Sequence, residues 1–116
     1  MNPAIGLLEF SSVTAGIVAA DAMVKRAPIG DLVTGSVQPG KYLVLVAGDV
    51  ASVEESVAAG VETSGESIVA RIILHDVHPA VVAALRGTRA HGPIEALGII
   101  ETGTVAPLLA AADIGL

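Results

Sequence analysis

Few residues of this sequence are of the types that act in catalysis or bind metal ions. The spacing of these few residues matches neither a catalytic motif nor a metal-binding motif. His75 and His78 stand three residues apart near the end of an expected strand. A metal site would need a third ligand with matching geometry, and the sequence offers no evident one. The chain contains no cysteine, which excludes disulfides, thiolate metal sites and cysteine nucleophiles within it. We therefore expect no catalytic residue, no bound metal and no cofactor.

The carboxylates that stand out are better explained by structure than by catalysis. Glu9 and Glu101 occupy equivalent positions in two similar stretches, which favours a structural role over paired acid–base work. Asp49 precedes an apolar helical pattern and is placed to cap that helix. No phosphate-binding loop of the type G-x-x-x-x-G-K-[ST] occurs. These observations predict a protein that is not an enzyme.

Composition narrows the class of protein further. Hydrophobic residues make up 53% of the 116 residues, aromatic residues only 2%, and the mean hydropathy is +0.74. A chain this apolar is not disordered, and a net charge of −6 argues against a nucleic-acid partner. No apolar run is long enough to span a membrane, and residues 1–4 lack the basic patch of a secretory signal. We therefore expect a cytoplasmic protein without a membrane partner.

The aliphatic excess itself predicts self-association. A domain of about 100 residues buries only about 65% of the surface that its unfolded chain exposes. So many aliphatic side chains should leave apolar patches outside, and such patches mark contacts with other chains.

The pattern of apolar runs and turn residues predicts four strands and two long helices. Strands are expected at 4–10, 31–37, 41–48 and 67–74, with a turn at Gln38, Pro39 and Gly40. Ser11 or Ser12 would cap the first helix, which Pro28 stops, and Asp49 would cap the second. The expected core-facing stripes are Val13, Ile17, Ala20 and Val24 in the first helix, and Val50, Val53, Val57 and Val61 in the second. A short helix at 80–85 would open at Pro79.

The resulting order, β-α-β-β-α-β, predicts an α+β fold of the split βαβ, ferredoxin-like type. Its sheet would be antiparallel, with the helices packed on one face.

An internal repeat is the most informative feature of the sequence. Residues 96–101 repeat residues 4–9 at an offset of 92, and Val105 and residues 111–113 continue the register of Val13 and residues 19–21. We predict a complete domain at 1–87, a linker at 88–93, and at 94–116 the first strand and helix of an incomplete second domain. This pattern indicates a truncated tandem, or a second unit that is completed elsewhere.

Four segments, taken in order, resemble a bacterial microcompartment (BMC) shell protein. They are residues 4–9, 20–27, 39–42 and 47–54. The likeness covers residues 4 to about 86, and residues 96–116 resemble the start of a second copy. The duplication points to the tandem-domain subfamily, whose chains form trimers shaped like hexamers.

The resemblance implies a tile in which six domains surround an axis and tiles pack edge to edge around encapsulated enzymes. The central opening would be lined by Ser36, Val37, Gln38 and Pro39. Lys25 would meet its two-fold mate in a neighbouring tile, with Asp21 and Arg26 beside it. Two departures matter. Residues 75–78 lack the basic residue often found in the family before its last helix, and the missing cysteine excludes a pore iron–sulfur cluster.

The sequence thus predicts a structural shell subunit with a central pore for small polar metabolites. Its partners would be itself, as a trimer if tandem or a hexamer if single-domain, and other shell proteins. The alternative is a trimeric small-molecule-binding regulatory protein of ferredoxin-like fold. Two simpler interpretations also stay open: residues 36–39 as an ordinary hairpin turn, and Lys25 as a solvated partner of Asp21.

Overall fold

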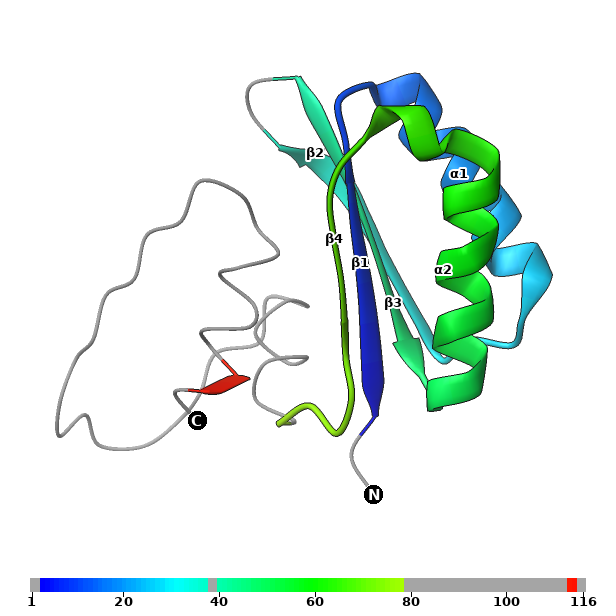
Figure 1. Cartoon of the computed structure of the whole chain (residues 1–116), viewed down its shortest axis with the longest axis vertical. Helices are drawn as coiled ribbons and strands as arrows, with labels where there is room; N and C mark the ends of the chain where they lie inside the picture. Colours follow the sequence, from blue (N-terminus) through cyan, green and yellow to red (C-terminus); the bar gives the residue numbers. More distant parts are fainter. Residues whose placement is uncertain (1–2, 38–39, 79–112, 115–116) are drawn as a thin grey trace, which may run out of the picture.

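A four-stranded antiparallel sheet carries both long helices on one of its faces (Figure 1). The computed structural model describes residues 3–37, 40–78 and 113–114. Its elements are β1 (Ala4–Phe10), α1 (Val13–Arg26), β2 (Asp31–Val37), β3 (Lys41–Gly48), α2 (Val50–Ser64), a 3-10 turn (Gly65–Ser67) and β4 (Ile68–Leu74). The strands lie in the order β2-β3-β1-β4. The predicted α+β fold class and element order are confirmed for this part of the chain.

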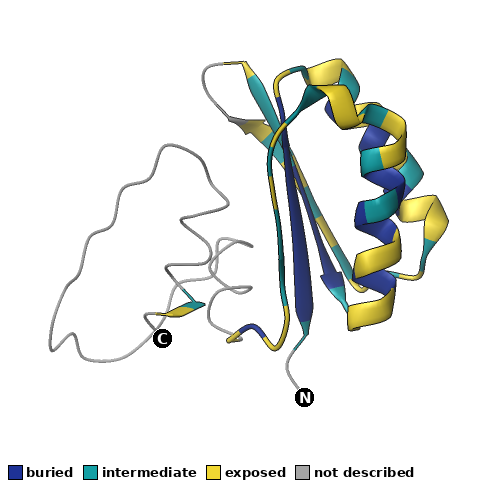
Figure 2. Ribbon diagram, viewed as in Figure 1, coloured by how far each residue is buried: buried dark blue, intermediate teal, exposed yellow. Residues whose placement is uncertain are grey.

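Strand β1 is buried along its whole length, as Figure 2 shows by its uniform dark blue. It pairs with β3 on one side and with β4 on the other. Leu8 and Phe10 belong to the core beneath the helices, whereas Ile5 and Leu7 belong to a separate cluster on the opposite face. A strand covered on both faces carries a continuous apolar run instead of an alternating pattern. The apolar run of β1 is the sequence signature of this position.

The face of the sheet opposite the helices, called here the second face, is also apolar. Its buried residues are Ile5, Leu7, Leu45, Ala47 and Val77, and partly buried residues of β2, β3 and β4 surround them. Val77 lies beyond the end of β4, and its backbone N–H donates to the carbonyl of Pro3 at 2.9 Å. This bond fixes the chain after β4 at the edge of the second face.

Helices α1 and α2 pack closely because small residues lie at their contacts. A Cβ on Gly60 would lie 2.6 Å from Leu8 Cδ1 and 2.9 Å from Met23 Sδ. The hydroxyl of Ser56 donates to the backbone carbonyl of Met23 at 3.0 Å. The hydroxyl of Ser64 donates to the backbone carbonyl of Ala15, also at 3.0 Å. These bonds satisfy buried polar groups without adding bulk between the helices.

The prediction of which face of α1 enters the core was wrong for three of its four residues. The buried residues of α1 are Gly16, Ala19 and Met23. Val13, Ile17 and Val24 are 39%, 53% and 41% exposed, whereas Ala20 is partly buried and packs against the core. At Gly16 the close approach of Tyr42 leaves no room for a side chain, and Met23 supplies the large buried side chain of α1.

The corresponding prediction for α2 was right in part. Val53 and Val57 are buried and Val61 packs partly against the core, but Val50, in the first turn, is 38% exposed.

The helix starts follow the predicted caps. Ser12 accepts a hydrogen bond from the N–H of Ala15, and Asp49 accepts one from the N–H of Ser52 at 2.9 Å. Strand β4 begins at Ile68, one residue later than predicted, because the 3-10 turn precedes it. The predicted helix at 80–85, the linker at 88–93 and most of the second unit lie outside the described residues. Asp113 and Ile114, which are described, are helical.

Candidate functional site

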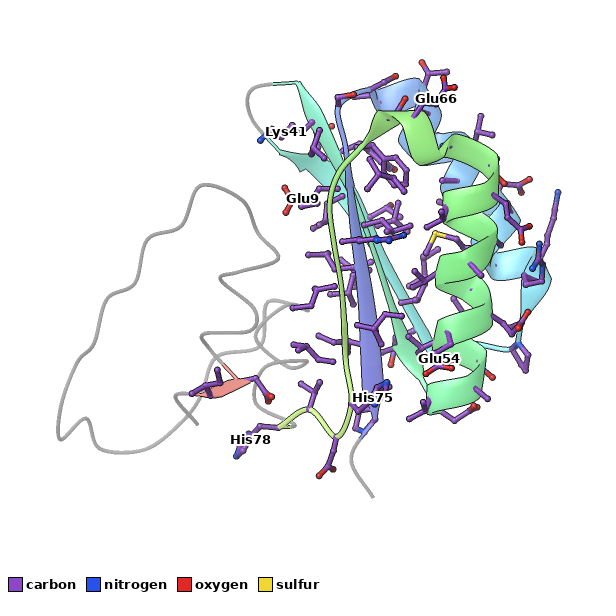
Figure 3. The ribbon with its side chains drawn as sticks, in the orientation of Figure 1. Glu9, Lys41, Glu54, Glu66, His75 and His78 are labelled. Atoms are coloured by element: carbon purple, nitrogen blue, oxygen red, sulfur yellow. The ribbon has the colours of Figure 1, made fainter. Side chains whose placement is uncertain are left out.

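The turn between β2 and β3 is the predicted pore loop. The two strands pair up to Val37 and Lys41, and the exposed Ser36 lies opposite Tyr42. Gly40 has a φ of +73°, a conformation that glycine adopts without strain, as the predicted turn requires. Gln38 and Pro39 lie outside the described residues. The turn therefore presents the Ser36 hydroxyl near the end of the sheet, with Lys41 at its base (Figure 3).

Lys25 and Asp21 form the predicted pair near the C-terminal end of α1. Lys25 Nζ lies 2.8 Å from Asp21 Oδ2, and the two side chains are 72% and 61% exposed. An exposed pair of this kind contributes only about 0.3–0.5 kcal/mol to helix stability. The pair orients Lys25 while leaving its ammonium group accessible from outside.

Arg26 lies beside this pair but has a different environment. Its guanidinium group lies 2.6 Å from Glu62 Oε2 and 3.7 Å from Glu55 Oε2, so it links α1 to α2. The hydrogen bond that Arg26 donates to Glu62 raises the pKa of Arg26 above its ordinary value, and the negative charge of Glu62 adds to the effect. Sequence analysis missed both glutamates because they lie 29 and 36 residues further along the chain.

The β2–β3 turn lies at the end of the sheet from which α1 starts, whereas Lys25 lies in the last turn of α1. The β2–β3 turn is at the end where β1 finishes, since Phe10 pairs with Tyr42, and α1 starts from that end. The 14 residues of α1 span about 21 Å and carry Lys25 toward the other end. The β2–β3 turn and the exposed ammonium group of Lys25 are thus separated by roughly the length of α1.

The histidines and the remaining acids do not assemble a reaction centre in the described ranges. His75 Nε2 lies 3.5 Å from Glu54 Oε1, and both side chains are more than half exposed (Figure 3). No three His, Cys, Asp or Glu residues within 3–37, 40–78 and 113–114 are grouped as a metal site would need. Among the helices of these same ranges, none has the length and apolar character to cross a bilayer.

Glu9 is the most deeply buried acid of the described part of the chain, with 1% of its surface exposed. In the register of the sheet it lies between Leu43 and Ala70, and its carboxylate is directed away from the helices (Figure 3). A buried carboxylate in an apolar face needs compensating interactions, and Glu9 has one. This environment fits the structural role predicted for it.

Comparison with known protein families shows to which family this chain belongs. The family described as the BMC domain matches residues 4–86, which include every strand and helix of the sheet layer described above. The chain belongs to the BMC domain family. This finding confirms the resemblance seen in the four sequence segments, and the fold is the one expected of a BMC domain.

The relatives of this BMC domain chain are shell proteins by name. It is 38% identical over 113 residues to the bacterial microcompartment shell protein PduT of Citrobacter freundii, covering 97% of this chain and 61% of that protein. It is 41% identical over 64 residues to the carboxysome shell protein CcmK2 of Thermosynechococcus vestitus, covering 55% and 63% of the two chains. These names do not favour the alternative of a ligand-binding regulator.

A solved structure agrees with these relatives. The crystal structure of a microcompartments protein from Desulfitobacterium hafniense DCB superposes with a TM-score of 0.89 at 46% identity, covering 97% of this chain and 63% of that one. The BMC chain described here therefore spans about three fifths of the length of PduT and of this structural relative.

Proposed function

We propose that this chain is a structural, non-enzymatic subunit of a bacterial microcompartment shell in the cytoplasm. Copies form a cyclic oligomer, and the oligomers tile into a sheet with other shell proteins around encapsulated enzymes. The observation that carries the proposal is the BMC domain match over residues 4–86, together with relatives that are named as shell proteins.

The finer proposal is that the chain belongs to the tandem-domain type and forms a trimer with six domains around the axis. The repeat at an offset of 92 supports it, because residues 94–116 then belong to a second unit. The helical state of Asp113 and Ile114 agrees with this, since the equivalent Asp21 and Ala22 lie in α1. The alignment with PduT, which runs over 113 residues, extends through the same region.

The central opening is proposed to be lined by Ser36, Val37, Gln38 and Pro39. A rotation axis repeats one loop several times at the centre, so small polar groups there become a ring. Hydroxyl and amide groups both donate and accept hydrogen bonds, and they replace part of the hydration shell of a polar metabolite. The absence of charged residues at positions 36–39 predicts weak discrimination by charge.

The outer edge of the tile is proposed to use Lys25, with Asp21 and Arg26 beside it. The argument rests on position and exposure. Lys25 lies about one helix length from the turn, so a turn at the axis leaves Lys25 toward the perimeter. Arg26 pairs with Glu62 and Glu55 of α2. It therefore ties this end of α1 to α2, and Lys25 is the cation that extends outward.

Electron microscopy of the purified chain tests the proposal. A shell subunit should form ordered two-dimensional sheets or tubes with a repeating unit that has rotational symmetry. A regulator of ferredoxin-like fold would instead remain dispersed and show a thermal shift that saturates with a small ligand. Dispersed particles with such a shift would overturn the shell assignment.

A further inference from the structure

The turn proposed to line the central opening lies beside two charged residues on opposite sides of the sheet. The first, Lys41, begins β3 directly after the turn and pairs with Val37 of β2. Side chains alternate along a strand, so Lys41 shares a face of β3 with Leu43 and Leu45, which belong to the second face. The Lys41 ammonium group therefore lies on the side of the sheet away from the helices (Figure 3).

The second charged residue, Glu66, lies at the same end of the sheet but on the helix side (Figure 3). It belongs to the 3-10 turn that connects α2 to β4. Together with Ala15 of α1 and the other residues at 61–67, it lines a hollow of about 410 Å³. Glu66 is exposed, so its carboxylate meets solvent on this side of the sheet.

The segments that carry the two charges are close together. The carbonyl of Ser67, next to Glu66, accepts a hydrogen bond at 2.8 Å from the N–H of Ser11, directly beyond the end of β1. On its other side β1 pairs with the start of β3, which carries Lys41. Neighbouring strands lie about 4.8 Å apart, so the backbones at Glu66 and Lys41 are separated by about 10 Å across the end of β1.

Neither charge is neutralised by an ion pair within residues 3–37, 40–78 and 113–114. The ion pairs of these ranges involve other residues. Glu9 is a further acid near this end, but only 1% of its surface is exposed, so solvent does not reach its carboxylate. At the turn, solvent therefore meets the cation of Lys41 on the second face and the carboxylate of Glu66 on the helix side.

We propose that Lys41 and Glu66 give the two mouths of the pore opposite charges, which makes uncharged polar solutes the favoured permeants. The inference rests on the proposed function, since an axis at the turn repeats each side chain in a ring around the opening. An anion is then attracted at the second-face mouth and repelled at the helix-side mouth, and a cation meets the reverse. Each kind of ion meets one barrier, whereas an uncharged solute meets none.

Three solutes of nearly the same size and shape measure these barriers: acetate, acetamide and acetamidinium. Their efflux is followed from closed shells built with the full chain, at about 0.15 M salt, where the Debye length is about 8 Å. We expect acetamide to leave about threefold faster than either ion, because a ring of three charges at about this distance slows an ion of the same sign by about that factor. Equal efflux of the three solutes overturns the proposal.

Single substitutions assign each barrier to its residue. Lys41→Gln should raise acetamidinium efflux about threefold without speeding acetate, and Glu66→Gln should do the converse. Glu54→Gln is the matched control, because it removes the same charge from α2 about 15 Å before the end of that helix, and it should change neither ion. A variant of Lys41 or Glu66 that changes both ions by the same factor overturns the assignment of that residue.

Salt provides a test that needs no substitution. At about 1 M salt the Debye length falls to about 3 Å, so the three solutes should leave the unaltered shells at nearly equal rates. Differences that survive at this salt concentration would come from something other than charge and would overturn the proposal.

Acetamide also separates this inference from the proposed function. If Ser36→Phe slows acetamide while the two ions meet no barrier in the unaltered shells, the charged mouths alone are rejected. If Ser36→Phe leaves acetamide efflux unchanged, the pore at this turn is rejected and the inference with it. A chain that never forms a ring rejects both.

Discussion

Gly16 of α1 lies directly against the ring of Tyr42 on β3, with no room for a side chain. A Cβ on Gly16 would overlap the ring, and it would lie 2.9 Å from Tyr42 Cβ, which cannot swing away as a flexible chain end can. Alanine normally stabilises a helix by up to about 1 kcal/mol relative to glycine. At this position the close contact reverses the sign.

We therefore predict that Gly16→Ala lowers the free energy of unfolding by about 1–3 kcal/mol, as overpacking typically does. Gly65→Ala is the matched control, because Gly65 has helical φ and ψ angles of −55° and −34° and its nearest neighbour would be Val61 Cγ1 at 3.8 Å. That variant should be neutral or stabilised. Denaturant unfolding at a fixed protein concentration measures both, and a stabilised Gly16→Ala would refute the packing described for α1.

The cap of α2 should depend on pH. The N–H and hydroxyl of Ser52 donate to the Asp49 carboxylate and hold its pKa below the ordinary value of 3.8. Since the pKa of Asp49 is lowered by folding, the cap stabilises the protein above pH 3.8 and its contribution is lost as the pH falls through the lowered folded value.

Asp49→Ala should accordingly lower Tm by a few degrees at neutral pH, with the deficit shrinking below pH 3.8. Asp49→Asn, which still caps but does not titrate, should show no such trend. A deficit of Asp49→Ala that is constant with pH would mean that the ionised carboxylate contributes nothing.

Lys25→Ala is predicted to abolish sheets while the ring keeps its mass. The substitution removes a pair worth only about 0.3–0.5 kcal/mol, so the fold should be unaffected. Lys41→Ala controls for the loss of one positive charge, here beside the β2–β3 turn, and should keep the sheets. Electron microscopy shows whether sheets form, and light scattering on the same samples gives the mass of the ring. Intact sheets from Lys25→Ala would remove Lys25 from the tile edge.

Enlarging Ser36 should slow permeation without disturbing assembly. Ser36→Phe places a ring beside the proposed opening, and Thr34→Phe places the same ring on an exposed position of β2 two residues further from the turn. The efflux of a small polar solute from closed shells should fall for Ser36→Phe alone. Equal efflux in the two variants, or loss of the ring in Ser36→Phe, would argue against a pore at this turn.

The sheet was predictable because its signals are local. Apolar runs bounded by turn residues define all four strands, and Ser12 and Asp49 define the helix starts. The core face of α1 was not predictable by the same means. Hydropathy assigns bulky aliphatic residues to the core, but two of the three buried residues of α1, Gly16 and Ala19, are small, and only Met23 is large. The same error concealed the exposure of Val13, Ile17 and Val24.

The electrostatic setting of the candidate edge was predictable only within one helix. The pair of Lys25 with Asp21 follows from a spacing of four residues along α1. The partners of Arg26 and His75 come from α2, at separations where only the tertiary packing brings the side chains together. For Glu9 the repeat predicts a structural role, whereas its burial leaves no local signal in the sequence.

The central claim is that copies of this chain assemble around an axis. Its most direct test is the mass of the purified chain in solution, determined by light scattering over a wide concentration range. The account predicts a single species whose mass is a fixed small multiple of the 11.5 kDa chain and persists on dilution. A mass of one chain at every concentration would contradict it.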